Sequence, residues 1–408
     1  MGGVPKCPHG LFISASSADS VLRRLWNPTI AFFYSTNPNE RRKAMIKEAI
    51  GKLVLKENLT AGEMEEVMKE MLGKRASGAQ IASFLTALRM KRETPEEITA
   101  AAKVLKEKSL KMNLGGDSVC LDKEEITVER ETILSTTKDS SGETAIFNIS
   151  TATALVVAGG DLKVAKYVKK SIFPLCGCAD VIEALGVNLD LTPTQLERCF
   201  KTLNICFIHE SLTHNGLEHF RDLRKKIGIR TLFNLLDLLI NPGGANVQVL
   251  GVYDPNLTET MATVLMNLGI KRGLVIHGKD TLDEISITGA TKVTELREGE
   301  IKNYTIEPED FGMKRRKLDE IKGGTKEQNA TTILEILKGV QGARRDVTVL
   351  NAAAAFVVAG RAKDFKEGMD LAKQAIDSGK GLEILDRLIQ FTNSERRFIR
   401  GELAAEMG

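Results

Sequence analysis

Short apolar runs alternate with helical segments in the second half of this chain, and this alternation constrains the fold more than any other feature. The runs 247–252 and 273–276 are apolar, whereas apolar residues in 256–269 recur at helical spacing. Buried strands that alternate with helices form largely parallel sheets with helices on both faces. The sequence therefore predicts an α/β fold with a mainly parallel central sheet flanked by helices.

Helical periodicity dominates residues 45–112. Asn58-Leu59-Thr60 is expected to cap one helix, and Thr94-Pro95 starts another with proline in its first turn. Two apolar faces are expected in the core of this part: Met64, Val67, Met68, Met71 and Leu72, and Ile81, Phe84, Leu85 and Leu88. Residues 180–236 are also helix-rich and show no strand-like run. We therefore expect a small helical domain from 45–112 and 180–236, and a larger α/β domain from 113–179 and 237–408.

Residues 1–44 lack a sustained period and are interpreted as an N-terminal extension, either an over-extended start or an arm that binds a partner. Asn27 and Pro28 break its apolar stretch, which argues against a secretory signal.

No run in the chain reaches the ~20 apolar residues of a membrane span. Six cysteines in 408 residues form no dense disulfide framework, so we expect a reducing, cytoplasmic location. The 57 basic and 54 acidic residues nearly balance, so composition alone identifies no partner.

Eight short segments keep a shared order and spacing along most of the chain. They are 80–91, 147–151 (Phe-Asn-Ile-Ser-Thr), 179–187, 230–234, 241–242, 251–253, 283–284 (Asp-Glu) and 351–355 (Asn-Ala-Ala-Ala-Ala). Together they resemble the anthranilate phosphoribosyltransferase family, whose fold is shared with pyrimidine nucleoside phosphorylases. The resemblance implies Mg²⁺-dependent transfer of phosphoribosyl from phosphoribosyl diphosphate to an aromatic amine, either anthranilate or an altered acceptor, with loss of pyrophosphate. It also implies a homodimer formed through the helical domain.

The resemblance places donor and metal ligands in two segments. Asn148, Ser150 and Thr151 would bind phosphoribosyl diphosphate together with Lys166, and Ser150 would also reach its Mg²⁺. Asp283 and Glu284 would complete the metal site, because Mg²⁺ prefers carboxylate, phosphate and water oxygens. Two plainer interpretations stay open. Ser150 and Thr151 could simply cap a helix, and the acidic pair could be an exposed turn.

Acceptor binding is implied for His214 and Arg224. The family's arginine faces the anthranilate carboxylate, to which a guanidinium can donate two parallel hydrogen bonds. The surrounding sequence differs from the family, since the usual Leu-Gly-Pro-Leu turn is Leu236-Asp237-Leu238-Leu239 here. The neighbourhood of the two acceptor residues has therefore drifted from the family pattern.

The family's phosphate-binding motifs are changed in this chain. Its Gly-Thr-Gly-Gly-Asp-Gly loop, whose backbone amides cradle phosphate, corresponds to 136–143 with only Gly142 remaining. Its Lys-His-Gly-Asn-Arg segment is Lys166-Tyr167-Val168-Lys169-Lys170 here, and Phe173 and Pro174 replace small hydroxylated residues. Apolar side chains cannot hydrogen-bond phosphate. We therefore expect activity that is altered, reduced or lost.

Two non-catalytic functions remain as alternatives. Lys163, Lys166, Lys169 and Lys170 at helical spacing could bind nucleic acid or another polyanion, although such a run is usually a solvated helix face. The chain could instead be a structural or regulatory dimeric subunit. Neither the histidines at 209, 214 and 219 nor the cysteines at 176 and 178 match a zinc spacing, so we expect no zinc site.

Overall fold

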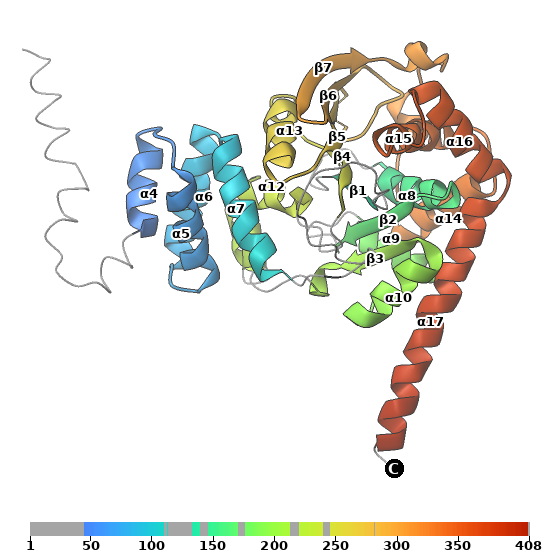
Figure 1. Ribbon diagram of the computed structural model, residues 1–408, viewed down its shortest axis with the longest axis horizontal. Coiled ribbons are helices and arrows are strands. Elements are labelled where there is room, and N and C mark those ends of the chain that lie inside the picture. The colour runs from blue at the N-terminus through green and yellow to red at the C-terminus, as the bar shows by residue number, and fades with distance from the viewer. Residues whose placement is uncertain are drawn as a thin grey trace, which may run out of the picture.

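The computed structural model describes residues 45–109, 112, 133–138, 146–169, 176–212, 220–239, 245–280 and 282–406 (Figure 1). A helical bundle begins the described chain and consists of α4 (Met45–Val54), α5 (Ala61–Leu72), α6 (Gly78–Lys91) and α7 (Pro95–Lys108). Thr60 and Thr94 are N-caps of α5 and α7, and each forms a capping box with the glutamate three residues later. The nine apolar residues predicted for this core are all buried. The two predicted helix starts and the two predicted apolar faces are confirmed.

The larger part is built on one seven-stranded sheet of order β3-β2-β1-β4-β5-β6-β7. The strands are β1 (Ile133–Lys138), β2 (Lys163–Val168), β3 (Ile205–His209), β4 (Val247–Gly251), β5 (Arg272–Gly278), β6 (Thr291–Arg297) and β7 (Glu300–Ile306). All pairings from β3 to β5 are parallel, and β6 and β7 continue the sheet antiparallel. This confirms the predicted α/β fold with a mainly parallel sheet.

Helices cover both faces of the sheet, as Figure 1 shows. The helices of this part and the bundle's later helices are α8 (Ile149–Gly159), α9 (Cys178–Ala184), α10 (Pro193–Leu203), α11 (Arg221–Ile227), α12 (Leu232–Leu239), α13 (Leu257–Asn267), α14 (Lys326–Leu337), α15 (Ala343–Val358), α16 (Phe365–Asp377) and α17 (Lys380–Glu406). Val249 and Leu274 belong to one hydrophobic core, and the next residues along the strands, Leu250 and Val275, belong to the core shared with the bundle. Alternate strand residues point to opposite faces, so both faces are buried.

The prediction that residues 180–236 contain no strand is wrong. Residues 205–209 form β3, which pairs with β2 in register from Val164↔Ile205 to Val168↔His209. A short, continuous apolar run buried on both faces has no alternation to reveal it, so its periodicity resembles that of a buried helix. The helices α9 and α10 pack in the core of the sheet. Phe220 and the apolar residues of α12, including Phe233, join the bundle core instead, and Leu223 and Ile227 of α11 pack against it.

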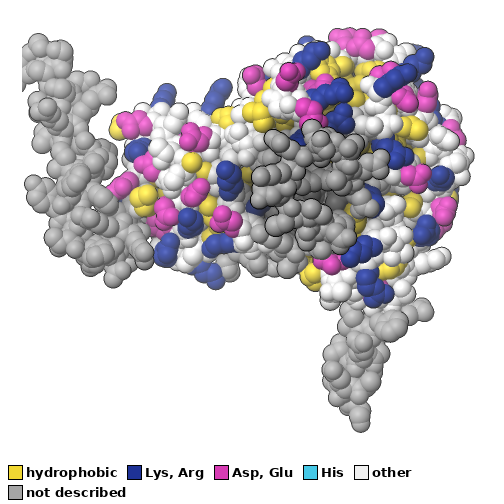
Figure 2. Space-filling view, viewed as in Figure 1, with side chains coloured by type: hydrophobic (Ala, Val, Ile, Leu, Met, Phe, Trp, Pro, Cys, Tyr) yellow, Lys and Arg dark blue, Asp and Glu magenta, His cyan; other side chains and the backbone are white. Residues whose placement is uncertain are grey.

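The prediction of a basic stripe at helical spacing is also wrong. Residues 163–168 form β2, in which Lys166 is only 2% exposed and Lys163 lies on the opposite face by strand alternation. Lys169 follows the strand and is ion-paired, and Lys170 lies outside the described residues. On the face shown in Figure 2, basic and acidic side chains are intermixed. In the described part of the chain, no helix has the length and apolar character needed to cross a membrane.

Candidate active site

The candidate site lies where the strand order changes direction. The chain passes from β1 to β2 and β3 on one side, and then crosses to β4 and β5 on the other side of β1. In parallel sheets, ligands bind outside the carboxyl ends of the strands at such a point. Lys169 follows the end of β2, Gly251 ends β4, and the Asp283–Glu284 pair follows β5. The fold therefore brings the predicted donor, metal and acceptor segments to one edge of the sheet.

The backbone at Asp283 packs directly against the end of β4. A Cβ atom built on Gly251 would lie 1.6 Å from the carbonyl oxygen of Asp283, so a side chain at residue 251 would displace the acidic segment. The next residue, Val252, donates its N–H to the carbonyl of Ile276 at 3.0 Å and contacts Nδ1 of His277 through its own carbonyl at 2.8 Å. The end of β4 thus fixes the position of the acidic pair.

A buried asparagine holds the other side of the acidic pair. Asn351 on α15 accepts a hydrogen bond from the N–H of Ile285 at 3.0 Å and donates one to the carbonyl of Ile285 at 2.9 Å. Glu284, directly before Ile285, is 3% exposed. The interpretation of this pair as an exposed acidic turn is therefore wrong. The assignment of Asp283 and Glu284 as Mg²⁺ ligands stays a prediction.

The hydroxyl groups of Ser150 and Thr151 are buried at the start of α8. Neither Oγ of Ser150 nor Oγ1 of Thr151 has a hydrogen-bond partner among the described residues, and the two residues are 7% and 0% exposed. A buried hydroxyl without a hydrogen-bond partner lowers the stability of the folded protein by about 1–3 kcal/mol. Both residues lie inside the helix rather than at its N-cap. Helix capping therefore does not explain them, and their oxygens fit a polyanionic ligand and its metal.

Asn148 and Lys166 are held within the protein. Asn148 is the N-cap residue of α8, and its Oδ1 accepts a hydrogen bond from Asn329 at 3.1 Å. Its amide nitrogen also lies 3.8 Å from Sγ of Cys178. Lys166 is buried in β2, two residues before the end of the strand. Their contacts with phosphoribosyl diphosphate stay predictions, and Asn148 has at least a structural function.

Arg224 is paired within the chain. Its Nη2 and Nζ of Lys169 both lie 2.8 Å from Oδ2 of Asp237 on α12. Burial alone would raise the pKa of Asp237, but the charges of Arg224 and Lys169 outweigh it and lower the pKa to about 2. We call these three residues the Asp237 cluster. His214, the other predicted acceptor residue, lies outside the described residues.

Sequence reasoning missed the Asp237 cluster, although a signal was present. Lys169 replaces the asparagine of one family motif, and Asp237 replaces the glycine of another. The two departures introduce opposite charges, and their side chains meet in the structure. Reading them together would have predicted the contact.

A cation–π stack joins the bundle to the carboxyl edge of the sheet. The guanidinium carbon of Arg230 lies 4.3 Å from the ring centroid of Tyr253, and that of Arg89 lies 5.4 Å from it. Arg89 belongs to α6 and Tyr253 follows β4. Three of the segments that carry the family resemblance therefore meet here.

Among the described residues, no three His, Cys, Asp or Glu side chains are grouped as a metal cluster. Two carboxylates at one place suit Mg²⁺ bound mainly through phosphates and water, rather than a metal enclosed by protein ligands. Cys176, Cys178, Cys199 and Cys206 are free thiols, and burial raises the pKa of Cys176 to about 11.

Comparisons with known proteins agree with this architecture. The family described as "Glycosyl transferase family, helical bundle domain" matches residues 47–109, and "Glycosyl transferase family, a/b domain" matches residues 140–382. An anthranilate phosphoribosyltransferase of Geotalea uraniireducens is 44% identical over 349 residues, covering 86% of this chain and 100% of that one. One from Acetivibrio thermocellus is 45% identical over 350 residues, covering 86% of this chain and 97% of that one.

Solved structures give the same result. The crystal structure of anthranilate phosphoribosyltransferase from Thermus thermophilus has a TM-score of 0.76 and 34% identity, and the match covers 85% of this chain and 99% of that one. The Saccharomyces cerevisiae enzyme in complex with PRPP and Mg has a TM-score of 0.74 and 25% identity, with coverages of 86% and 98%.

The two family matches place the chain among glycosyl transferases with a helical bundle domain and an α/β domain, in agreement with the bundle and the mainly parallel sheet of the structure. Within that class, the chain belongs to the anthranilate phosphoribosyltransferase family. The family predicted from the sequence is confirmed.

Proposed function

We propose that this chain transfers phosphoribosyl from phosphoribosyl diphosphate to an aromatic amine, with an acceptor pocket that differs from the family pattern. The observation that carries the proposal is the rigidly held Asp283–Glu284 segment at the switch in strand order, fixed by Gly251 on one side and Asn351 on the other. Relatives that are 44–45% identical along nearly their whole length carry the name of this activity.

The donor end of the site follows from the same residues. Asp283 and Glu284, with Ser150, would hold Mg²⁺, and the hydroxyl of Thr151 would hydrogen-bond an oxygen of the diphosphate. When bound, the metal would neutralise the pyrophosphate as it leaves. The buried hydroxyls are already in place, so little reorganisation is needed as charge develops on the leaving group.

The acceptor end is where we expect the chain to differ. An acceptor carboxylate would have to share Arg224 with Asp237, whose own carboxylate already accepts from that guanidinium at 2.8 Å. Two carboxylates close to one arginine repel each other. Lys169 adds a positive charge where the family has a neutral asparagine. We therefore propose weak selection for a carboxylate on the acceptor.

Two measurements test the function. Calorimetry of the full chain with phosphoribosyl diphosphate should give binding heat that depends on Mg²⁺. Turnover assays should then give kcat/KM for anthranilate less than about tenfold above that for aniline, a difference of less than ~1.4 kcal/mol. Absence of heat at millimolar donor would end the enzyme proposal. A preference for anthranilate far above tenfold would leave the donor assignment intact and refute only the altered acceptor pocket.

We also propose that the chain forms a homodimer through the bundle. Val54, Leu55 and Met90 are 64%, 63% and 80% exposed, and they lie on or directly after α4 and α6, which pack together. A patch of large apolar side chains exposed on neighbouring helices marks an interaction surface. Met90→Glu should shift the chain from dimer to monomer in light scattering, whereas Val340→Glu, at an exposed apolar residue outside the bundle, should not. A monomeric wild-type chain would contradict the proposal.

The compartment stays a prediction. The four cysteines in the described residues are free, which agrees with the reducing cytoplasm expected from the sequence.

A further inference from the structure

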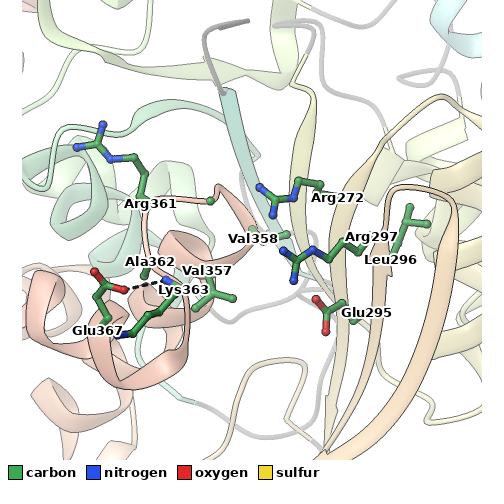
Figure 3. A pocket seen from close by; sticks show the side chains of 11 residues that line it. Arg272, Glu295, Leu296, Arg297, Val357, Val358, Arg361, Ala362, Lys363 and Glu367 are labelled. Carbon is green, nitrogen blue, oxygen red and sulfur yellow. Dashed lines mark hydrogen bonds between the residues drawn. The ribbon is translucent and has the colours of Figure 1, made fainter. Parts of the chain in front are cut away.

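A cavity of about 460 Å³ lies at the amino end of β5, the end opposite to the one that the acidic pair of the candidate site follows. It is lined by the first residue of β5, the last residues of β6, and the connection from α15 to α16 (Figure 3). Arg272 begins β5, whereas the acidic pair follows the end of that strand. The cavity is therefore separate from the site described above, and its size suits a small organic ligand.

Two arginines face each other across the strands at this cavity. Arg272 of β5 pairs directly with Arg297 of β6 in the antiparallel register, so both side chains lie on the same face of the sheet. Figure 3 shows both guanidinium groups directed toward the connection between α15 and α16. Like charges directly opposite each other destabilise a sheet. A bound anion would remove that cost.

The surrounding charges leave the cavity positive. Arg361 and Lys363 line its other wall, and Glu295 and Glu367 supply the only acidic side chains among the lining residues. Glu367 accepts a hydrogen bond from the backbone N–H of Lys363 at 2.9 Å, and Glu295 accepts one from Tyr304 at 3.3 Å. Among the described residues, the two facing arginines make one ion pair, a long contact of 3.9 Å between Arg272 and Glu298.

The wall opposite the arginines is shaped to approach them closely. Gly360 has φ +72°, and a Cβ atom there would lie 2.4 Å from Nη1 of Arg272. Only glycine permits both the left-handed backbone and this close approach. The guanidinium of Arg272 is thus held between the strand and the turn, with a side-chain exposure of 28%. A planar donor held in this way is suited to a multidentate oxyanion.

We propose that this cavity binds a small phosphate dianion, either free phosphate or the phosphate group of a small metabolite, through Arg272 and Arg297. The two guanidinium groups provide paired N–H donors for phosphate oxygens, and Arg361 and Lys363 supply further positive charge at the opening. The remaining volume accommodates a small organic group attached to the phosphate.

Calorimetric titration of the full chain with inorganic phosphate, in the presence of EDTA, tests the proposal. Wild-type protein should bind phosphate, and Arg297→Gln should weaken that site at least tenfold while leaving any binding at the other edge of the sheet unchanged. Lys271→Gln removes an exposed positive charge next to the cavity that does not line it, and should change the dissociation constant less than twofold.

Thermal unfolding in low salt gives an independent measurement. Arg297→Gln should have the same midpoint as wild type or a higher one without phosphate, since a like-charge pair is removed, and should lose the increase that phosphate gives to wild type. Tighter binding of glycerol 3-phosphate than of phosphate would support a metabolite, and equal binding would support free phosphate. Equal weakening by Lys271→Gln and Arg297→Gln, or no phosphate binding by wild type, would overturn the proposal.

Discussion

Asp283→Asn is expected to lower kcat by roughly a thousandfold, which corresponds to a loss of ~4 kcal/mol of transition-state stabilisation. The substitution keeps the shape of the side chain but removes the negative charge that would hold Mg²⁺ beside the leaving pyrophosphate. The backbone contacts of this segment, from Gly251 and Asn351, do not involve the Asp283 side chain. Because the two side chains have the same size and shape, we expect the thermal midpoint to change little, and steady-state turnover with phosphoribosyl diphosphate measures the effect.

Two controls make this result specific. Asp370→Asn removes an exposed carboxylate on α16 and should leave kcat within twofold of wild type. Raising the Mg²⁺ concentration should recover part of the activity of Asp283→Asn, because weakened metal affinity can be offset by mass action. Full activity of Asp283→Asn at low Mg²⁺ would remove this residue from the metal site.

Asp237→Leu is expected to lower the free energy of unfolding by about 3–5 kcal/mol, because it leaves two cations without their shared carboxylate in a mostly buried place. The side chains of Lys169 and Arg224 are only 19% and 14% exposed. Urea unfolding measures the change. Asp319→Leu breaks an exposed ion pair with Lys322 and should leave the urea midpoint unchanged.

The pH dependence of this effect has a defined sign. The pKa of Asp237 is lowered from 3.8 to about 2, so its stabilisation is complete above pH 3.8 and is lost as the pH falls through about 2. The stability difference between wild type and Asp237→Leu should therefore narrow over that range. A difference that stays constant down to pH 2 would contradict the charge-based explanation.

The double variant Lys169→Asn with Asp237→Gly restores both family residues and connects stability to function. The variant removes the Lys169 cation and the Asp237 carboxylate together, so we expect a smaller loss of unfolding free energy than with Asp237→Leu. The glycine itself contributes about 1 kcal/mol to that loss, because glycine is unfavourable within a helix such as α12. Because Arg224 is released, kcat/KM for anthranilate should rise relative to that for aniline. An unchanged ratio would show that the Asp237 cluster does not control acceptor selection.

The fold was largely predictable because most of its elements carry independent local signals. Thr60 precedes α5 with a glutamate three residues later, and the apolar residues of α5 and α6 recur at helical spacing. β3 was the exception. Its residues are buried on both faces of the sheet, so its sequence lacks the alternation of apolar and polar residues that marks a half-exposed strand. The prediction of a lysine stripe was wrong for the same reason, because a strand was read as a helix. Lys163, Lys166 and Lys169 recur at helical spacing but lie in or directly after β2.

The candidate site was predictable in its residues but not in its contacts. Asp283, Glu284, Ser150 and Thr151 stand in short segments whose order identifies the family. The pairing of Arg224 with Asp237 depends on where α11 and α12 pack, and the cavity at Arg272 depends on strand register. Such relationships arise only from tertiary structure, although the opposite charges of Lys169 and Asp237 gave an indication.

The packing of Gly251 against Asp283 has a consequence for engineering this scaffold. Functional variants from a library that randomises the donor end should almost all keep glycine at residue 251. The side chain of any larger residue would clash with the backbone of Asp283. The α11–α12 region, by contrast, already tolerates an exchange of neutral for charged side chains. Attempts to evolve new acceptors should therefore mutate that region and keep the end of β4 unchanged.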